Sequence, residues 1–216
     1  MATSDTRVEY RKSTAREYFE SICVAVILAL FVRTFVVQAF KIPTGSMENN
    51  LLIGDHLLVN KFVFAPTATG LEEALLPIDP IRRGDIVVFK YPEEPERDFI
   101  KRVIGLPGDT VELRDRRMYI NGQPVDEPYT QYLMPHPGEE GALDFDVRVQ
   151  YGPASVPDGH YFMMGDNRDN SQDSRYWGFL PREYVKGKAL FVYFSLDDQG
   201  GLLSGVRWRR LLHQIH

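Results

Sequence analysis

The sequence predicts a mostly β domain preceded by one N-terminal transmembrane helix. Three observations lead to this fold class. The only long apolar run lies near the N-terminus, within residues 20–40. After residue 41, short apolar runs alternate with turn residues, in a chain that holds 17 Gly and 14 Pro and is 12% aromatic. No helical period of useful length recurs in this second part except at residues 206–215, where the pattern allows a short helix.

The composition limits the classes of function. A chain of 216 residues has room for one folded domain and an appendage. Its net charge of -5 offers no basic surface, so we expect no nucleic-acid partner. The single cysteine, Cys23, lies inside the apolar run, so no disulfide can form within the chain. This leaves the redox compartment open, because many periplasmic domains also lack disulfides.

The apolar run is interpreted as a membrane anchor. Residues 21–32 are uninterrupted but shorter than the ~20 residues of a spanning helix, and residues 35–40 complete that length with Arg33 inside the segment. An arginine is tolerated near the edge of a bilayer, where its long side chain reaches the headgroups. The alternatives are a buried core helix and a cleaved signal peptide. The run shows no polar face, and the segment around Ala39 is a poor cleavage site, although Ala29 leaves that alternative open.

The charges that flank the run set the expected topology. Basic residues mark the cytoplasmic side of a membrane segment. Four of them precede the run and few follow it closely: Arg7, Arg11, Lys12 and Arg16. We therefore expect residues 1–19 to form a cytoplasmic tail, residues 20–40 the anchor, and residues 41–216 an extracytoplasmic β domain.

Strands are expected where β-branched and aromatic residues run between turns. The expected strands are residues 57–64, 86–91, 99–104, 110–113, 118–120, 161–164 and 188–194. Residues 65–80 should form a loop with one helical turn at 71–76. We expect about residues 111–158 to form an insertion that is rich in loops from residue 123 on, because Pro, Gly and acidic residues are frequent there.

A serine nucleophile is suggested by Pro43-Thr44-Gly45-Ser46-Met47, which follows directly on the apolar run. A serine hydroxyl is a weak nucleophile at neutral pH and needs a neighbouring base. None of the five histidines lies in a recognisable catalytic setting, and the chain has no G-x-S-x-G elbow. The other known base is a lysine, whose amine must be neutral to accept a proton.

Lys101 fits the requirements of such a base. In a strand it would share one face with Phe99 and Val103, and burial beside apolar side chains lowers the pKa of a lysine amine. Most strand lysines lie on solvent-facing sides or at edges, so this position alone does not establish a catalytic role.

Residues 165–175 form an unusual stretch of eleven residues with no apolar member. A calcium loop is one interpretation, but the EF-hand pattern fails whether it starts at Asp166 or at Asp169. A solvated turn is the second interpretation. The third is a buried polar network in which Asp173 pairs with Arg175 and Ser171 donates to a neighbour. The residues alone leave the last two open.

Taken together, these motifs resemble the type I signal peptidases, a family of bacterial Ser-Lys dyad serine proteases also called leader peptidases. The family's motifs follow the order membrane anchor, P-S-G-S-M-x-P-T-L-x-x-G-D, R-G-D-I-V-V-F, Y-I-K-R-x-x-G-x-P-G-D and G-D-N-R-x-x-S-x-D-S-R. The chain carries similar stretches in the same order at residues 43–55, 83–89, 99–109 and 165–175. One motif would be weak evidence, whereas the ordered set is specific.

The resemblance implies a role for each matched residue. Ser46 would be the nucleophile and Lys101 the general base. The Ser46 N–H and the Thr44 hydroxyl would form the oxyanion hole, where each donor contributes a few kcal/mol. Ser171 would hydrogen-bond the lysine, and Gly165 would leave room beside it. A charged pair would brace the loop: Asp173 and Arg175. The resemblance implies no metal and no cofactor.

The chain departs from the family pattern at three places. Thr44 stands where serine is commoner, and it keeps the hydroxyl. Residues 48–50, Glu-Asn-Asn, replace x-P-T, which should loosen the turn without changing a reacting group. Phe99 replaces tyrosine, which suits an apolar substrate wall.

The resemblance also implies the fold and the substrate. The family folds as two antiparallel sheets with a small inserted subdomain, in agreement with the strand-rich pattern. Its substrates are extended segments before signal-peptide cleavage sites, with small residues at P1 and P3. Such a peptide can add itself as a strand to exposed edges, which we expect at residues 40–46 and 98–101. Its pockets would be lined by Phe40, Ile42, Met47, Leu51, Asp98, Phe99 and Ile100.

The expected function is that of a membrane-anchored endopeptidase that removes signal peptides from exported preproteins after small-x-small sites. Its partners would be those signal peptides and the lipid bilayer. It would act as a monomer in the bacterial inner membrane, with the catalytic domain on the outer face, where the cleavage site emerges. Two rivals are another tethered Ser-Lys peptidase, such as a conjugation-type enzyme, and a non-catalytic β-rich binding factor. The presence of Ser46, Lys101 and Ser171 together argues against the second.

Overall fold

The computed structural model describes residues 13–64, 79–133, 146–197 and 205–215. The chain divides into two compact units, Met1–Val36 and Val37–His216. The described part of the first unit is helical, and the strands lie in the second.

The first unit contains an exposed apolar helix. α1 (Thr14–Phe31) begins after Ser13, whose side chain accepts a hydrogen bond from Arg16 N, and it continues as the π-helical turn η1 (Val32–Val36). The stretch Thr14–Val36 has 23 residues and a mean hydropathy of 2.1, and none of its apolar window is buried. At 1.5 Å per residue, 23 residues extend about 35 Å, against a hydrocarbon core of about 30 Å. By length and composition, this helix could cross a membrane.

The helical stretch begins and ends earlier than the expected 20–40. It begins at Thr14 because Ser13 supplies an N-cap. It ends at Val36 because the next five residues form strand β1 (Val37–Lys41). Every residue of β1 pairs with β2 (Asp55–Asn60), so the last part of the apolar run gains a sheet partner instead of another helical turn.

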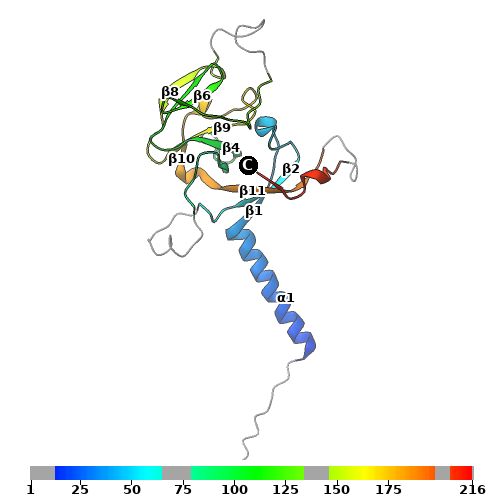
Figure 1. Cartoon of the computed structure of the whole chain (residues 1–216). Helices are drawn as coiled ribbons and strands as arrows, with labels where there is room; N and C mark the ends of the chain where they lie inside the picture. Colours follow the sequence, from blue (N-terminus) through cyan, green and yellow to red (C-terminus); the bar gives the residue numbers. More distant parts are fainter. Residues whose placement is uncertain (1–12, 65–78, 134–145, 198–204, 216) are drawn as a thin grey trace, which may run out of the picture. The chain divides into compact units, whose positions relative to one another are not determined.

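The second unit is organised around an antiparallel sheet of eight strands (Figure 1). The order is β1-β2-β11-β3-β4-β9-β10, and β12 pairs with β11 outside this path. Strand β11 thus lies between β2 and β3, although it comes late in the sequence. The bounds are β3 (Ile86–Lys90), β4 (Asp98–Gly105), β9 (His160–Met164), β10 (Leu180–Pro181), β11 (Val185–Ser195) and β12 (His213–Gln214).

A second antiparallel sheet is built from residues 110–155, in the order β7-β6-β5-β8. Its strands are β5 (Thr110–Arg114), β6 (Arg117–Ile120), β7 (Gln123–Pro124) and β8 (Tyr151–Ser155). Two antiparallel sheets confirm the predicted fold class. Strand β8 lies in the stretch expected to be rich in loops, where Gly152 and Pro153 weaken the strand signal.

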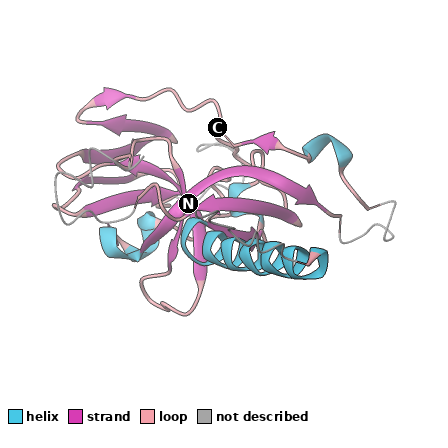
Figure 2. Ribbon diagram, turned by 90° about the horizontal axis from the view of Figure 1, so that it is seen from below, coloured by secondary structure: helices cyan, strands magenta, loops and turns pink. Residues whose placement is uncertain are grey.

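Strands are the main element of the second unit, as Figure 2 shows, and its helices are short. They are η2 (Gly45–Met47), α3 (Ser174–Trp177), η3 (Arg182–Tyr184) and η4 (Trp208–Arg210). The helix allowed at residues 206–215 is wrong, because that stretch contains only η4 and β12. Its backbone bonds instead to β11, for example from Arg207 N to Ser195 O at 3.0 Å. The helical turn expected at 71–76 lies outside the described residues.

Strand β4 contributes to all three apolar clusters in the described part of the second unit: Ile100 packs against one, and Val103 and Ile104 belong to the other two. One apolar cluster joins the β1, β2, β3 and β11 region and includes Leu57, Val88 and Val192, all at most 2% exposed. Another joins β9 to the second sheet through Phe162 and Met164. β4 pairs with β3 from Asp98 to Arg102, but it pairs with β9 only from Arg102 onward. Residues 98–101 therefore keep one free edge, as predicted.

Candidate active site

Ser46 lies on a short buried turn that follows β1. It is the second residue of η2, and its side chain and backbone are only 7% exposed. Two hydrogen bonds from Asn167 hold the turn: its backbone N–H donates to Ser46 O at 3.1 Å, and its side chain donates to Gly45 O at 3.2 Å. The next residue, Met47, is fully buried in the core. The hydrogen bonds from Asn167 and the burial of Met47 together hold the turn in place.

Lys101 approaches this turn from β4. Its Nζ atom lies 2.7 Å from Ser46 Oγ and 3.1 Å from the backbone oxygen of Ile100. The residue is 3% exposed, and its Nζ lies 5.2 Å from the centre of the Phe99 ring. The two residues are 55 positions apart in the sequence. The structure brings the predicted nucleophile and the predicted base into hydrogen-bonding contact.

Burial lowers the pKa of the Lys101 amine to about 8. A charged ammonium group is disfavoured where water cannot solvate it, and this is the largest cause of the shift. The carboxylates of Asp173 and Asp166 act in the opposite direction, and Arg175 lowers the pKa further. At pH 7 a pKa of about 8 leaves about one amine in ten neutral, which is enough for a base.

The loop of residues 165–175 is a buried polar network and not a solvated turn. Asp173 and Arg175 form a fully buried ion pair, with Nε–Oδ1 and Nη2–Oδ2 distances of 2.8 Å. Asp173 also accepts a hydrogen bond from Gly165 N at 3.1 Å. The Arg175 guanidinium and these bonds keep the pKa of the Asp173 carboxyl below its ordinary value, although burial itself is the largest influence and acts to raise it. The buried pair of Asp173 and Arg175 in the third interpretation is therefore present in the structure.

Gly165 and Ser171 lie directly beside the dyad. A Cβ atom on Gly165 would lie 2.3 Å from Ser171 Oγ and 2.4 Å from Ser46 O, so only glycine fits there. The Ser171 hydroxyl is buried and helps to lower the pKa of Asp173, but it makes no hydrogen bond of ordinary geometry. The predicted bond from Ser171 to Lys101 is not formed in this structure, in which the amine bonds to Ser46 and Ile100.

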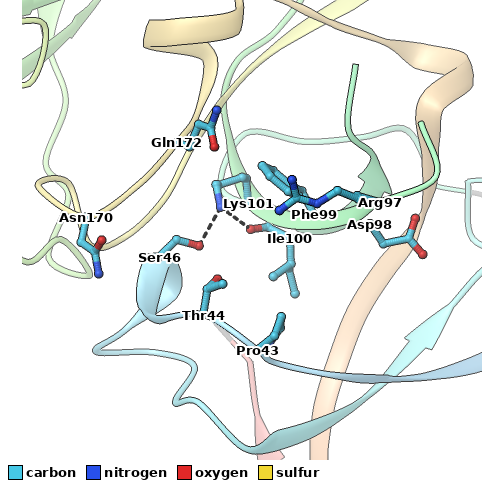
Figure 3. Close-up of a pocket in the computed structure, with 10 residues that line it drawn as sticks. All are labelled: Pro43, Thr44, Ser46, Arg97, Asp98, Phe99, Ile100, Lys101, Asn170 and Gln172. Carbon is cyan, nitrogen blue, oxygen red and sulfur yellow. Dashed lines mark hydrogen bonds between the residues drawn. The ribbon is translucent and has the colours of Figure 1, made fainter. Parts of the chain in front are cut away.

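A cavity of about 430 Å³ opens beside Ser46 and Lys101 (Figure 3). Thr44 is exposed and lines this cavity. The Ser46 N–H belongs to the first turn of η2, where the helix itself provides no acceptor. Both residues of the predicted oxyanion hole thus line the cavity, and their role as donors stays a prediction. The full lining is Pro43, Thr44, Ser46, Arg97, Asp98, Phe99, Ile100, Lys101, Asn170 and Gln172.

A second cavity of about 30 Å³ shares part of this lining and is mostly apolar. Five of the seven residues predicted for substrate binding line it: Phe40, Ile42, Asp98, Phe99 and Ile100. Met47 and Leu51 line neither cavity; both are fully buried in the core cluster beneath the turn. Their apolar character serves packing, which a motif cannot distinguish from a pocket wall.

Several residues of the site were not predicted from the sequence. Asn167 holds the serine turn, and a buried ion pair at 2.7 Å joins Arg102, next to the lysine, to Asp166. The Arg102 guanidinium also stacks 3.8 Å from the centre of the Tyr129 ring. Asp166 and Asn167 belong to the polar loop that was recognised in the sequence, and Arg102 follows Lys101 directly. The motifs therefore contained these residues but did not show which residues they would contact.

The described residues contain no metal-binding cluster of three or more His, Cys, Asp or Glu side chains. No histidine lines the cavity beside Ser46. The arrangement can perform acyl transfer: a buried hydroxyl contacts an amine of lowered pKa, and two donors lie beside an open cavity.

Known proteins resemble the chain over most of its length. Residues 15–194 match the family described as "Signal peptidase, peptidase S26". A protein named "Signal peptidase I" from Pseudomonas aeruginosa is 39% identical over 212 residues, which cover 84% of this chain and 73% of that protein. Another of that name from Bacillus licheniformis is 36% identical, covering 87% of this chain and 93% of that protein. A solved structure described as a signal peptidase I from Enterococcus faecalis V583 is 38% identical, covers 51% of this chain and 97% of that one, and has a TM-score of 0.41.

Proposed function

Since the chain belongs to the signal peptidase family, peptidase S26, a family of serine peptidases, we propose that it removes signal peptides from exported preproteins with a Ser46–Lys101 dyad. The observation that carries the proposal is the 2.7 Å contact between Lys101 Nζ and Ser46 Oγ in a buried site. Burial also lowers the pKa of Lys101 to about 8, and a shifted pKa beside a hydroxyl group that lines a cavity is typical of a functional site.

The proposed reaction begins with a proton transfer. Neutral Lys101 accepts the Ser46 hydroxyl proton while Oγ attacks the carbonyl carbon of the scissile bond. The negative oxygen of the tetrahedral intermediate is stabilised by the Ser46 N–H and the Thr44 hydroxyl. The Lys101 ammonium then donates its proton to the leaving amine, and an acyl-enzyme forms. A water molecule, deprotonated by the same amine, hydrolyses the ester and restores Ser46.

The surrounding bonds suit this role for the lysine. The backbone oxygen of Ile100 accepts a hydrogen bond from Nζ, which fixes the amine and leaves its remaining positions for Ser46 and the substrate. The Asp173 and Asp166 carboxylates stabilise the ammonium that forms during attack, because both raise the pKa of Lys101. Lys101 is therefore neutral often enough to accept the Ser46 proton, and its ammonium form is stabilised after the transfer.

The free edge of β4 offers a place for the substrate backbone. In the described part of the chain, no strand pairs with residues 98–101 on the side away from β3, and residues 40–43 line the smaller cavity together with residues 98–100. An extended segment can pair there as an added strand. The cavity of about 30 Å³ admits only a small side chain, which supports a preference for small residues at P1 and P3.

The apolar helix supports membrane attachment. We propose that Thr14–Val36 anchors the chain once in the bacterial inner membrane, with the N-terminal tail in the cytoplasm and the β domain on the outer face. The substrate's own apolar segment lies in the same bilayer, so the anchor restricts the search to two dimensions. We propose that the protein acts as a monomer, since all members of the site lie on one chain.

The direct test uses the full-length protein in detergent with a preprotein that carries an Ala-x-Ala cleavage site. Ser46→Ala and Lys101→Ala should each abolish cleavage while the circular dichroism spectrum stays that of the wild type. Cleavage that persists in Ser46→Ala would refute the dyad. A conjugation-type peptidase would cleave its own precursor but not this preprotein, and a non-catalytic binding factor would leave it intact.

A further inference from the structure

The cavity beside Ser46 has an apolar end and a polar end. At the mainly apolar end, the residues shared with the smaller cavity are Pro43, Asp98, Phe99 and Ile100. At the polar end, Asn170 and Gln172 come from the loop of residues 165–175, and Figure 3 shows Asn170 on the side of Ser46 away from Ile100. If the apolar end receives the segment before the scissile bond, as the proposed function requires, the polar end is left for the residues that follow it.

The Gln172 side chain is held by a packed aromatic pair. Gln172 donates a hydrogen bond from Nε2 to the Tyr91 hydroxyl at 3.0 Å. The Tyr91 ring stacks on the Phe99 ring, with centres 4.3 Å apart, and its hydroxyl donates to Glu93. Gln172 is nevertheless exposed to solvent. Its side-chain oxygen is therefore a positioned acceptor beside the cavity, available for a substrate N–H.

Glu48 adds a negative charge next to this end. A Cβ atom on Gly45 would lie 2.9 Å from Glu48 Oε2 and 3.6 Å from Asn170 Nδ2, so both side chains flank the residue before the nucleophile. Glu48 is half-buried, and in the described part of the chain no ion pair neutralises it. Apart from Lys101, the charged residues that line the cavity are paired elsewhere: Arg97 with Glu94 and Asp98 with Lys186.

We propose that Asn170, Gln172 and Glu48 form the subsite for the first residues of the mature protein, after the scissile bond. The two amides bind the main chain of that segment, and the Glu48 carboxylate favours basic side chains and disfavours acidic ones. At a partly exposed site, the interaction of two nearby unit charges changes kcat/KM by about fivefold, and added salt weakens the effect. The substrate class is thus preproteins whose mature part begins with neutral or basic residues.

The test uses the full-length protein and three fluorogenic peptides with one common Ala-x-Ala segment. The second residue after the scissile bond is Lys, Gln or Glu. We expect kcat/KM to fall in the order Lys, Gln, Glu, by about fivefold at each step in low salt. Glu48→Gln should remove this order, whereas the matched control Glu183→Gln, an exposed carboxylate on η3 that lines neither cavity, should keep it.

A second pair of peptides tests the amides. One ends with the residue after the scissile bond and the other continues for three more residues. Asn170→Ala combined with Gln172→Ala should reduce kcat/KM more for the long peptide than for the short one, whereas a general folding defect would reduce both equally.

Three results would overturn the subsite: equal kcat/KM for Lys, Gln and Glu in the wild type, an order that survives Glu48→Gln, or equal losses on the short and long peptides. Each of these leaves the dyad intact as long as Ser46→Ala abolishes cleavage of the Gln peptide. Cleavage of none of the peptides by the wild type would overturn both proposals together.

Discussion

Replacing Lys101 by Met should make the protein inactive but more stable at neutral pH. Methionine has a similar length and no charge, so it fills the same buried space without the penalty of an ammonium group. The size of that penalty follows from the pKa of Lys101, which falls from 10.5 to about 8 on folding. At about 1.4 kcal/mol per pH unit, the shift corresponds to about 3 kcal/mol of lost stability at pH 7.

The penalty depends on pH with a definite sign. Below pH 8 the amine is charged in both the folded and the unfolded state, so the whole penalty is present. As the pH rises from about 8 toward 10.5, the folded state releases its proton first and the penalty disappears. The stability gain of Lys101→Met should therefore shrink from about 3 kcal/mol at pH 7 to about 1 kcal/mol at pH 9.5.

Thermal unfolding of the full-length protein in detergent can measure this difference. For a chain of 216 residues, a gain of about 3 kcal/mol raises Tm by about 6–12 °C. The comparison of wild type and variant at two pH values isolates the titration of Lys101, because lost packing contacts would affect both pH values equally. A variant less stable than the wild type at pH 7, or a Tm difference that does not narrow at pH 9.5, would refute the reasoning.

Three further predictions follow from the site. The wild-type kcat/KM should rise about tenfold between pH 7 and pH 9, with a midpoint near the pKa of Lys101, about 8; a midpoint near 6.5 would indicate a histidine instead. Gly165→Ala should lower kcat about 100-fold at unchanged secondary structure, because the new Cβ must displace the backbone of Ser46; an active variant would contradict the close packing. Arg210→Met should lower the free energy of unfolding by about 3–5 kcal/mol, because it leaves the fully buried Asp55 carboxylate unpaired; the exposed Arg209→Met serves as the control and should change it by less than about 0.5 kcal/mol.

The sequence was sufficient for those parts of the fold in which side-chain pattern and backbone structure agree. Strands β3, β4 and β9 were predicted because their β-branched and aromatic residues run without interruption between turns. β8 was missed because Gly152 and Pro153 hide it. A helix was allowed at residues 206–215 because a local pattern carries no information about Asp55, which binds Arg210 from 155 positions away.

The same limit applies to the candidate site. Ser46 and Lys101 could be named from motifs, since each motif carries its own reacting group. The residues that hold this pair in place could not be named in the same way. The hydrogen bond from Asn167 to Gly45 spans 122 positions, and neither motif indicates that these two residues meet. Met47 and Leu51 were assigned to a pocket because apolar residues beside a nucleophile can face either the substrate or the core, and here they face the core.

The position of β11 has a consequence for the order in which the enzyme becomes active. The nucleophile follows β1, which pairs with β2, and the base lies on β4, which pairs with β3. These two halves of the sheet are joined through β11, whose residues 185–195 are made near the end of synthesis. Until residues 185–195 have been made, serine and lysine belong to two separate hairpins. The contact between Ser46 and Lys101 therefore depends on one of the last strands to be synthesised.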